Sequence, residues 1–193
     1  AETWPLALED TPAYRQFGKR FNTQYRESVF VGYRYYQSFA KPVCFPFGFG
    51  LSYTSFAIDN LQVSQTSLAP GETLEVSVRV NNTGSRAGKE VLQLYVSPPD
   101  SALFRPQKEL KAFAKVALEP GESRVVNFKL QHGDFAYWNA RIHSWHCGAG
   151  EYRLLLGTSA AETPLEATVE VATAQPEVSA PACSQSAPRY PRP

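Results

Sequence analysis

Histidine and cysteine side chains are the first candidates for chemistry in this sequence, because imidazole and thiolate groups bind zinc. His143, His146 and Cys147 form a His-x-x-His-Cys run, and His132 lies upstream of it. A structural zinc site uses separated pairs of ligands, and this run lacks them. We therefore expect an ordinary strand and loop here, with no metal ligands. The sequence also has no glycine-rich phosphate loop and no Gly-x-Ser-x-Gly elbow, so we expect no nucleotide cofactor and no serine nucleophile.

Aromatic side chains offer a second kind of chemistry, because their rings can stack on sugars. The candidates for such carbohydrate binding are Trp4, Tyr33, Tyr35, Tyr36, Tyr137 and Trp138. Packing in a core or an interface is the favoured use of these rings, since aromatic residues dominate interfaces through the area they bury.

Length and composition limit the classes of function. The chain has 193 residues, of which 43% are hydrophobic and 19% charged, with a formal net charge of +1. This balance gives no electrostatic reason to expect nucleic acid or an acidic membrane as partner. No apolar run approaches the roughly 18 residues of a membrane span. The absence of methionine and the start at Ala1 suggest a cleaved product or a fragment, and the compartment stays open.

The cysteines and a possible glycosylation site each allow two interpretations. Cys44 and Cys147 could pair, although two buried thiols are favoured, and Cys183 lies near the C-terminus. Asn81-Asn82-Thr83 is a glycosylation sequon, but the same residues also suit a turn.

Three regions can be distinguished along the chain. Residues 1–56 are rich in aromatic residues and are expected to be the end of a preceding domain, since so dense an aromatic segment must lie against something. Within them, residues 28–36 are β-branched and aromatic and predict a strand, with nothing of helical period nearby. The glycines and proline of Phe45–Gly50 predict turns.

Residues 57–172 predict a β-sandwich. Apolar and polar residues alternate as in half-buried strands. About seven strands follow, as in an immunoglobulin-like or fibronectin III-like sandwich: Leu74–Val80, Leu92–Val96, Val126–Leu130, Tyr152–Leu156 and Leu165–Val171, with weaker candidates at Ile58–Val63 and Leu110–Leu118. The fold class is therefore mainly β.

A short sequence occurs twice, each time just before a predicted strand. Leu68–Thr73 (LAPGET) recurs as Leu118–Ser123 (LEPGES), and each copy precedes an alternating strand. Pro followed by Gly suits a type II turn, in which the second of these residues needs a positive φ.

The third region, residues 173–193, carries five prolines and is expected to be disordered.

Several motifs together resemble the C-terminal part of glycoside hydrolase family 3, a family of β-glucosidases and related exo-acting enzymes. They are Leu8–Tyr14, Tyr25–Tyr36 (YRESVFVGYRYY), Phe45–Phe56 (FPFGFGLSYTSF), Asn82–Val96, Arg105–Lys111, Glu119–Glu122, Trp145, Gly150–Arg153 and Leu156–Ser159. The resemblance covers about residues 4–172. It implies that residues 1–56 end the family's α/β sandwich domain and that residues 57–172 form its fibronectin type III-like domain.

The resemblance also implies where the chemistry lies. Retaining hydrolysis needs two carboxylates, a nucleophile and an acid/base. In this family the nucleophilic Asp belongs to a barrel and the general-acid Glu to a motif upstream, so both would precede Ala1. Glu27 is a tempting substitute, but a structural carboxylate paired with Arg26 or Arg34 is favoured. Glu9 and Asp10 are expected to be turn or capping residues. No catalytic residue is carried over.

We therefore expect the C-terminal fragment of a β-glucosidase-like enzyme acting on a β-glucoside or related oligosaccharide. The sandwich would buttress the missing N-terminal catalytic domains of the same polypeptide, and the fragment itself would be inactive. The alternative is a free-standing binding module for polysaccharide or protein, which rests on the fold alone.

Overall fold

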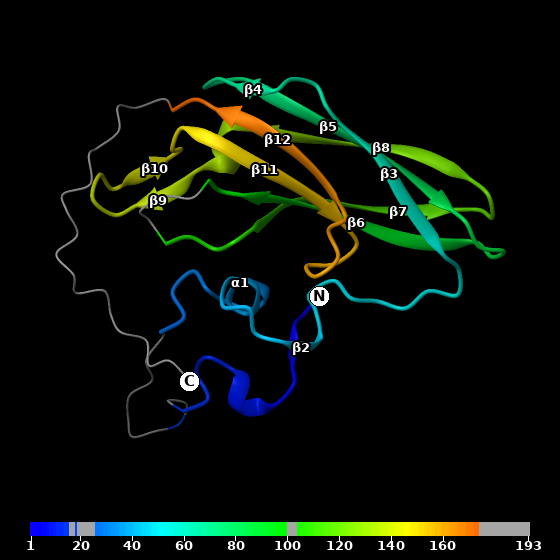
Figure 1. Cartoon of the computed structure of the whole chain (residues 1–193), viewed down its shortest axis with the longest axis horizontal. Helices are drawn as coiled ribbons and strands as arrows, with labels where there is room; N and C mark the ends of the chain where they lie inside the picture. Colours follow the sequence, from blue (N-terminus) through cyan, green and yellow to red (C-terminus); the bar gives the residue numbers. More distant parts are fainter. Residues whose placement is uncertain (16–17, 19–25, 100–103, 174–193) are drawn as a thin grey trace.

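The computed structural model describes residues 1–15, 18, 26–99 and 104–173. Its dominant element is a sandwich of two sheets, in which every strand pair is antiparallel except the short parallel pair of β4 and β12 (Figure 1). The three-stranded sheet has the order β3-β5-β8, formed by Phe56–Val63, Thr73–Asn82 and Ser123–Gln131. The five-stranded sheet has the order β4-β12-β11-β6-β7, formed by Ser67–Leu68, Leu165–Val171, Gly150–Gly157, Gly88–Ser97 and Glu109–Leu118. The mainly β fold and all seven predicted strands are confirmed.

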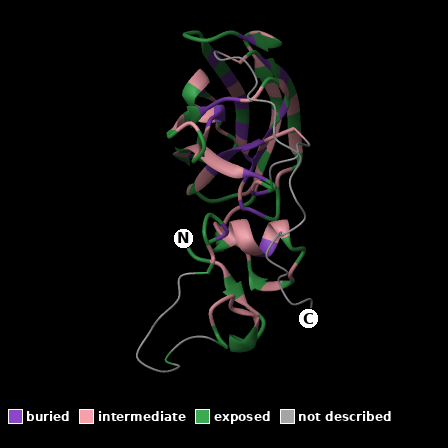
Figure 2. Ribbon diagram, turned by 90° about the vertical axis from the view of Figure 1, so that its left-hand side faces the viewer, coloured by how far each residue is buried: buried purple, intermediate pink, exposed green. Residues whose placement is uncertain are grey.

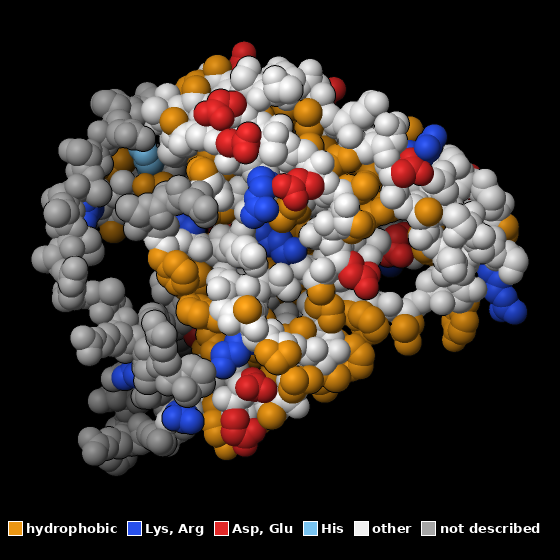
Figure 3. Space-filling model, viewed as in Figure 1, with side chains coloured by type: hydrophobic (Ala, Val, Ile, Leu, Met, Phe, Trp, Pro, Cys, Tyr) orange, Lys and Arg blue, Asp and Glu red, His pale blue; other side chains and the backbone are white. Residues whose placement is uncertain are grey.

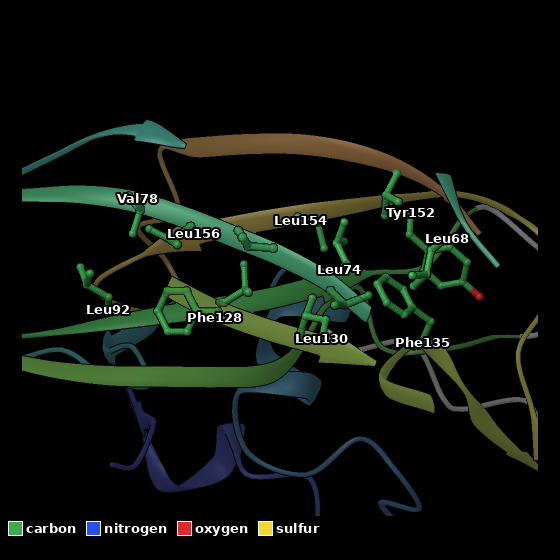
Figure 4. Close-up of a cluster of buried hydrophobic side chains, with 14 of the residues drawn as sticks. Leu68, Leu74, Val78, Leu92, Phe128, Leu130, Phe135, Tyr152, Leu154 and Leu156 are labelled. Carbon is green, nitrogen blue, oxygen red and sulfur yellow. The ribbon is translucent and has the colours of Figure 1, made fainter. Parts of the chain in front are cut away.

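The core fills the space between the two sheets, as Figure 4 shows. Alternate residues of β5 point inward, so Leu74, Val76, Val78 and Val80 are all fully buried. Phe128 and Leu130 of β8 face side chains from β6, β11 and β12 in the same cluster. Burying one such side chain contributes about 1.5–3 kcal/mol. The sandwich therefore carries a core of its own.

Both repeated turns have the positive φ that was predicted at their glycines. Gly71 and Gly121 have φ values of 87° and 74°, which a side chain would disfavour. In each turn the glutamate that follows accepts a hydrogen bond from a backbone N–H three residues earlier. Glu72 Oε2 lies 2.8 Å from Ala69 N, and Glu122 Oε2 lies 2.8 Å from Glu119 N. The repeated sequence thus builds the same closed turn before β5 and before β8.

The described part of the N-terminal segment, residues 1–15, 18 and 26–55, lies against one side of the sandwich (Figure 1). Its elements are β1 (Trp4–Pro5), the 3-10 helix η1 (Leu8–Asp10), helix α1 (Tyr33–Ser38) and β2 (Val43–Phe45), and β1 pairs with β2. Figure 2 shows buried residues concentrated in the sandwich, whereas this segment is mostly exposed or intermediate. None of the helices in the described ranges could cross a membrane.

The strand predicted over residues 28–36 is wrong. Gly32, with φ 58° and ψ −132°, turns the chain, and Tyr33–Ser38 then form α1. The β preference of aromatic residues reflects a fit to a half-buried surface rather than a backbone rule. A strand would place Tyr33 and Tyr36 on opposite faces, whereas the three-residue spacing places them on one side of the helix.

A small hairpin stands apart from both sheets. It follows the 3-10 helix η2 (His132–Phe135) and consists of β9 (Tyr137–Asn139) and β10 (Ser144–His146).

The cysteines and the C-terminal tail are the remaining features predicted from the sequence. Cys44 and Cys147 are both free, but Cys44 is exposed, so the prediction of two buried thiols is wrong for Cys44. The predicted tail lies outside the described residues except for Thr173.

Candidate interdomain interface

Helix α1 is joined to the sandwich through backbone N–H groups at the start of β7. The Tyr33 hydroxyl accepts a hydrogen bond from Leu110 N at 2.8 Å. At the other end of the helix, Ser38 Oγ accepts one from Gln107 N at 2.9 Å. Because both bonds involve fixed backbone atoms of the sandwich, they set the position of the helix on its surface.

An aromatic contact reinforces this junction. The Tyr33 ring lies 5.0 Å from the Phe47 ring and 5.8 Å from the Tyr95 ring, measured between centroids. Tyr95 is fully buried, and its burial raises the pKa of the phenol far above its usual value. The three rings therefore connect α1, the loop after β2 and strand β6 in one packed unit.

A buried lysine lies beneath this ring. Lys108 is 5% exposed, and its Nζ lies 5.2 Å from the centroid of the Tyr95 ring. Its ammonium donates a hydrogen bond to Thr163 Oγ1 at 3.3 Å. Burial, with a smaller contribution from nearby Arg153, lowers the pKa of Lys108 to about 8. The cation is thus held by a hydroxyl and a ring face, with no carboxylate ion pair among the described contacts.

The loop after β2 lies against the Gln93 side chain of strand β6, which Gly48 approaches closely. The Gln93 amide donates to Thr158 O at 2.7 Å and its carbonyl accepts from the Tyr95 hydroxyl. Phe47 O accepts from Ala160 N at 2.7 Å. This loop therefore contacts both β6 and the connection between β11 and β12.

Charge gathers at the same junction around Glu109. Its carboxylate oxygens lie 3.6 Å from Arg34, 3.6 Å from Arg105 and 3.4 Å from Lys111. Arg34 belongs to α1, and the other three residues belong to the sandwich. One carboxylate shared among three cations leaves the junction locally positive.

The N-terminal segment exposes many apolar side chains to solvent. Leu51 and Tyr53 are each 93% exposed. Further exposed apolar side chains of this segment are Trp4, Leu6, Leu8, Val29, Val31, Phe45 and Phe49. Figure 3 shows apolar side chains along the lower part of the molecule, where this segment lies. Together these nine residues form what we call the open apolar face. Exposed apolar patches of this kind mark interaction surfaces.

The carboxylates singled out in the sequence lie in the N-terminal segment. Asp10 Oδ2 accepts from Ala7 N at 3.2 Å and so caps η1, and Glu9 is exposed in the same turn. Glu27 is half-buried. Burial raises the pKa of Tyr36, and nearby Tyr35, Asp10 and Glu27 add to the rise. The ion pair suggested between Glu27 and Arg34 is replaced by the pair between Arg34 and Glu109.

The histidine and cysteine candidates are dispersed. His132 Nε2 lies 2.6 Å from Ala172 O, His143 occupies the hairpin turn with φ 47°, and His146 is buried with its ring 5.5 Å from that of Tyr137. Burial raises the pKa of the Cys147 thiol. In the described ranges, no three His, Cys, Asp or Glu residues are grouped to hold a metal ion.

The aromatic candidates divide into packed and exposed ones. Tyr33 is packed at the junction and Tyr36 is buried beside Tyr35, whereas Trp4 and Trp138 are 60% and 53% exposed. Gln93, Lys108 and Glu109 were not among the residues predicted from the sequence to have a role. Their position in the motifs Asn82–Val96 and Arg105–Lys111 was the only signal available for them.

The sequon residues are engaged in the fold. The Asn81 amide donates to Asp59 Oδ2 at 3.1 Å, and its carbonyl accepts from the Ser123 hydroxyl. Asn81 thus lies at the end of β5, and the turn begins after Asn82.

Comparisons with known proteins identify relatives. A model of the fibronectin type III-like domain matches residues 90–160. The chain is 44% identical over 172 residues to the thermostable β-glucosidase B of Acetivibrio thermocellus, a match that covers 89% of this chain and 23% of that protein. It is 46% identical over 160 residues to a β-glucosidase of Kluyveromyces marxianus, covering 81% of this chain and 18% of that one.

A solved structure agrees with these matches. The crystal structure of a GH3 β-glucosidase of Bifidobacterium adolescentis superposes with a TM-score of 0.83 at 40% identity, covering 90% of this chain and 25% of that chain. The chain thus spans a quarter or less of the length of these relatives.

Proposed function

Because the chain matches the C-terminal region of glycoside hydrolase family 3 β-glucosidases and carries a fibronectin type III-like domain, we propose that it works as the C-terminal part of such an enzyme. The whole enzyme would hydrolyse O-glycosyl bonds of a β-glucoside or related oligosaccharide. In this proposal the sandwich supports the catalytic domains and holds them in one orientation, and the domain boundaries lie near residues 56 and 172.

The observation that carries the proposal is that the N-terminal segment is bonded to the sandwich and also exposes many apolar side chains. The segment is held on the sandwich by hydrogen bonds to Leu110 and Gln107 and by the ring of Tyr33. The nine residues of the open apolar face take no part in these contacts, and their exposure to water is unfavourable. A segment that is bonded to the sandwich and also exposes many apolar side chains is suited to link the sandwich to a further domain.

The chain alone is expected to be inactive. Retaining glycosidases need two carboxylates about 5–5.5 Å apart. Asp10 is committed to its cap, and Glu109 is neutralised by three cations. We place both catalytic carboxylates in the portion of the enzyme that precedes this chain.

A chimera tests the proposal. The portion of the Acetivibrio β-glucosidase B that precedes the matched region would be joined to this chain, and hydrolysis of an aryl β-glucoside measured. We expect activity in the chimera and none in the 193-residue chain. Activity of the chain alone would overturn the proposal and make Glu27 the first residue to substitute.

Substitutions in the open apolar face test whether this face stabilises the whole enzyme or whether the sandwich is only joined to it by the chain. We expect Leu6→Ser with Leu8→Ser to lower the melting temperature of the chimera by several degrees while leaving that of the isolated chain unchanged, since both side chains are already exposed in it. Phe113→Ser is the matched control, because Phe113 is 68% exposed on the sandwich. Equal effects in the chimera and the isolated chain would contradict a buttress role.

A further inference from the structure

The β9–β10 hairpin presents two tryptophans to solvent on one face. Trp138 and Trp145 are cross-strand partners, with ring centroids 5.9 Å apart and ring planes at 78°. They are 53% and 65% exposed. We call these two side chains the tryptophan face. Neither belongs to the open apolar face of the N-terminal segment.

The opposite face of the hairpin attaches it to the sandwich. Tyr137 and His146 are also cross-strand partners, and His146 is buried. The Arg105 guanidinium lies 5.0 Å above the Tyr137 ring and donates to Phe135 O. Because these residues anchor the hairpin, the exposed tryptophans are not needed to hold it in place. An exposed aromatic pair without an anchoring role indicates a binding surface.

The described chain ends beside this hairpin. Val171, at the end of β12, pairs with Gly150, the first residue of β11, which follows shortly after β10. Ala172 O lies 2.6 Å from His132 Nε2, and His132 begins the 3-10 helix that leads into β9. Figure 1 shows β12 ending at the same end of the sandwich as β9 and β10. The described part of the chain therefore ends at the same end of the sandwich as the hairpin that carries the tryptophan face.

We propose that the tryptophan face binds the proline-rich stretch Ala174–Pro193 of the same chain. Aromatic surfaces recognise proline-rich peptides, whose restricted backbone loses little entropy on binding. The last seven residues read Ala-Pro-Arg-Tyr-Pro-Arg-Pro, so prolines alternate with groups that also favour indole rings. Arginine guanidinium groups bind over tryptophan faces through cation–π attraction.

Covalent attachment makes weak binding sufficient. An extended proline-rich chain advances about 3.1 Å per residue, so even half of this stretch spans about 30 Å. A short flexible tether gives an effective concentration in the millimolar range. The face would therefore be occupied most of the time if the same peptide, added separately, bound with a Kd below about 1 mM. This inference does not depend on the proposed function.

Tryptophan quenching tests the proposal in the full chain. The chain has only 3 tryptophans, so a Trp4→Phe background leaves the tryptophan face as the sole indole reporter. Acrylamide quenching would be compared between this protein and the same protein with Pro188→Ala, Pro191→Ala and Pro193→Ala. We expect the quenching constant to rise about 1.5-fold or more on proline removal, because a bound segment shields the rings. Ser184→Ala with Ser186→Ala is the matched control, which keeps every proline and should change nothing.

A peptide of residues 182–193, added to the proline-depleted protein, gives the second measurement. We expect saturable protection from quenching with a Kd below about 1 mM. With Trp138→Ala or Trp145→Ala, followed by NMR of the remaining indole N–H, the peptide-induced shift should be lost. Circular dichroism confirms that each variant is folded. Equal quenching with and without the prolines, together with no peptide binding, would overturn the proposal. The proposal would also be overturned if soluble β-glucan oligosaccharides protected the tryptophans from quenching equally well in the proteins with and without the prolines.

Discussion

Gly48 lies so close to the side chain of Gln93 that a Cβ atom on Gly48 would come within 2.1 Å of Nε2. Its φ of 85° also disfavours any side chain. We predict that Gly48→Ala lowers the free energy of unfolding by about 1–3 kcal/mol, because the Gln93 amide must leave Thr158 O or the loop must lift. Urea denaturation measures this. Gly50→Ala is the control, since nothing lies within 4 Å of its added Cβ. Equal losses in both variants would show that the contact with Gln93 is unimportant.

Removing one hydroxyl tests how α1 is attached. Tyr33→Phe keeps the ring contacts with Phe47 and Tyr95 but leaves Leu110 N without its acceptor. We expect a loss of about 1–2 kcal/mol in the free energy of unfolding, with faster amide exchange at Leu110. Tyr53→Phe, at a side chain that is 93% exposed, should change neither quantity. Unchanged exchange at Leu110 would contradict the bond.

The buried amine of Lys108 should make stability depend on pH. Its pKa is lowered to about 8 in the folded protein, against an ordinary lysine pKa of 10.5. Between these values the unfolded chain binds more protons, so the free energy of unfolding rises with pH. From pH 7.5 to 9.5 we expect a gain of about 1–2 kcal/mol relative to Lys108→Met, which cannot titrate. Parallel stability curves for the two proteins would show that the pKa of Lys108 is not lowered.

Asn82 tests the link between the N-terminal segment and the sandwich. Its carbonyl accepts from Thr54 Oγ1 at 2.7 Å and Gly84 N at 3.1 Å, and its amide donates to Arg86 O and Leu118 O. We predict that Asn82→Ala costs about 2–4 kcal/mol of unfolding free energy, because several buried groups lose their partners at once. Thermal unfolding measures the loss.

Two comparisons sharpen this prediction. Asn127→Ala, at an exposed position of β8, should leave the melting temperature unchanged. Asn82→Asp should be no better than Asn82→Ala, since a carboxylate cannot donate to the two carbonyl groups. Full stability of the Asp variant would exclude the proposed roles of the amide.

Much of the sandwich could be predicted because its signal is local. Leu74, Val76, Val78 and Val80 alternate with polar residues, and one buried face is enough to fix a strand and its register. The turns at Gly71 and Gly121 were equally readable, since Pro-Gly determines the backbone there.

The N-terminal segment was less predictable because its conformation depends on distant contacts. Residues 28–36 have the composition of a strand, yet Tyr33 finds its partners on β6 and β7, far along the chain. Gln93 and Lys108 look like ordinary polar residues of strands and loops. Their burial becomes visible only when Tyr95 and Thr163 are brought beside them.

The hydrogen bonds from Tyr33 and Ser38 have a consequence for solubility as well as for position. Strand β7 is the outermost strand of the larger sheet, and the unpaired backbone groups of such strands can recruit strands from other molecules. At its leading end, Leu110 N and the nearby Gln107 N are already occupied by side chains of α1. The helix therefore also shields that end of the sheet against edge-to-edge aggregation.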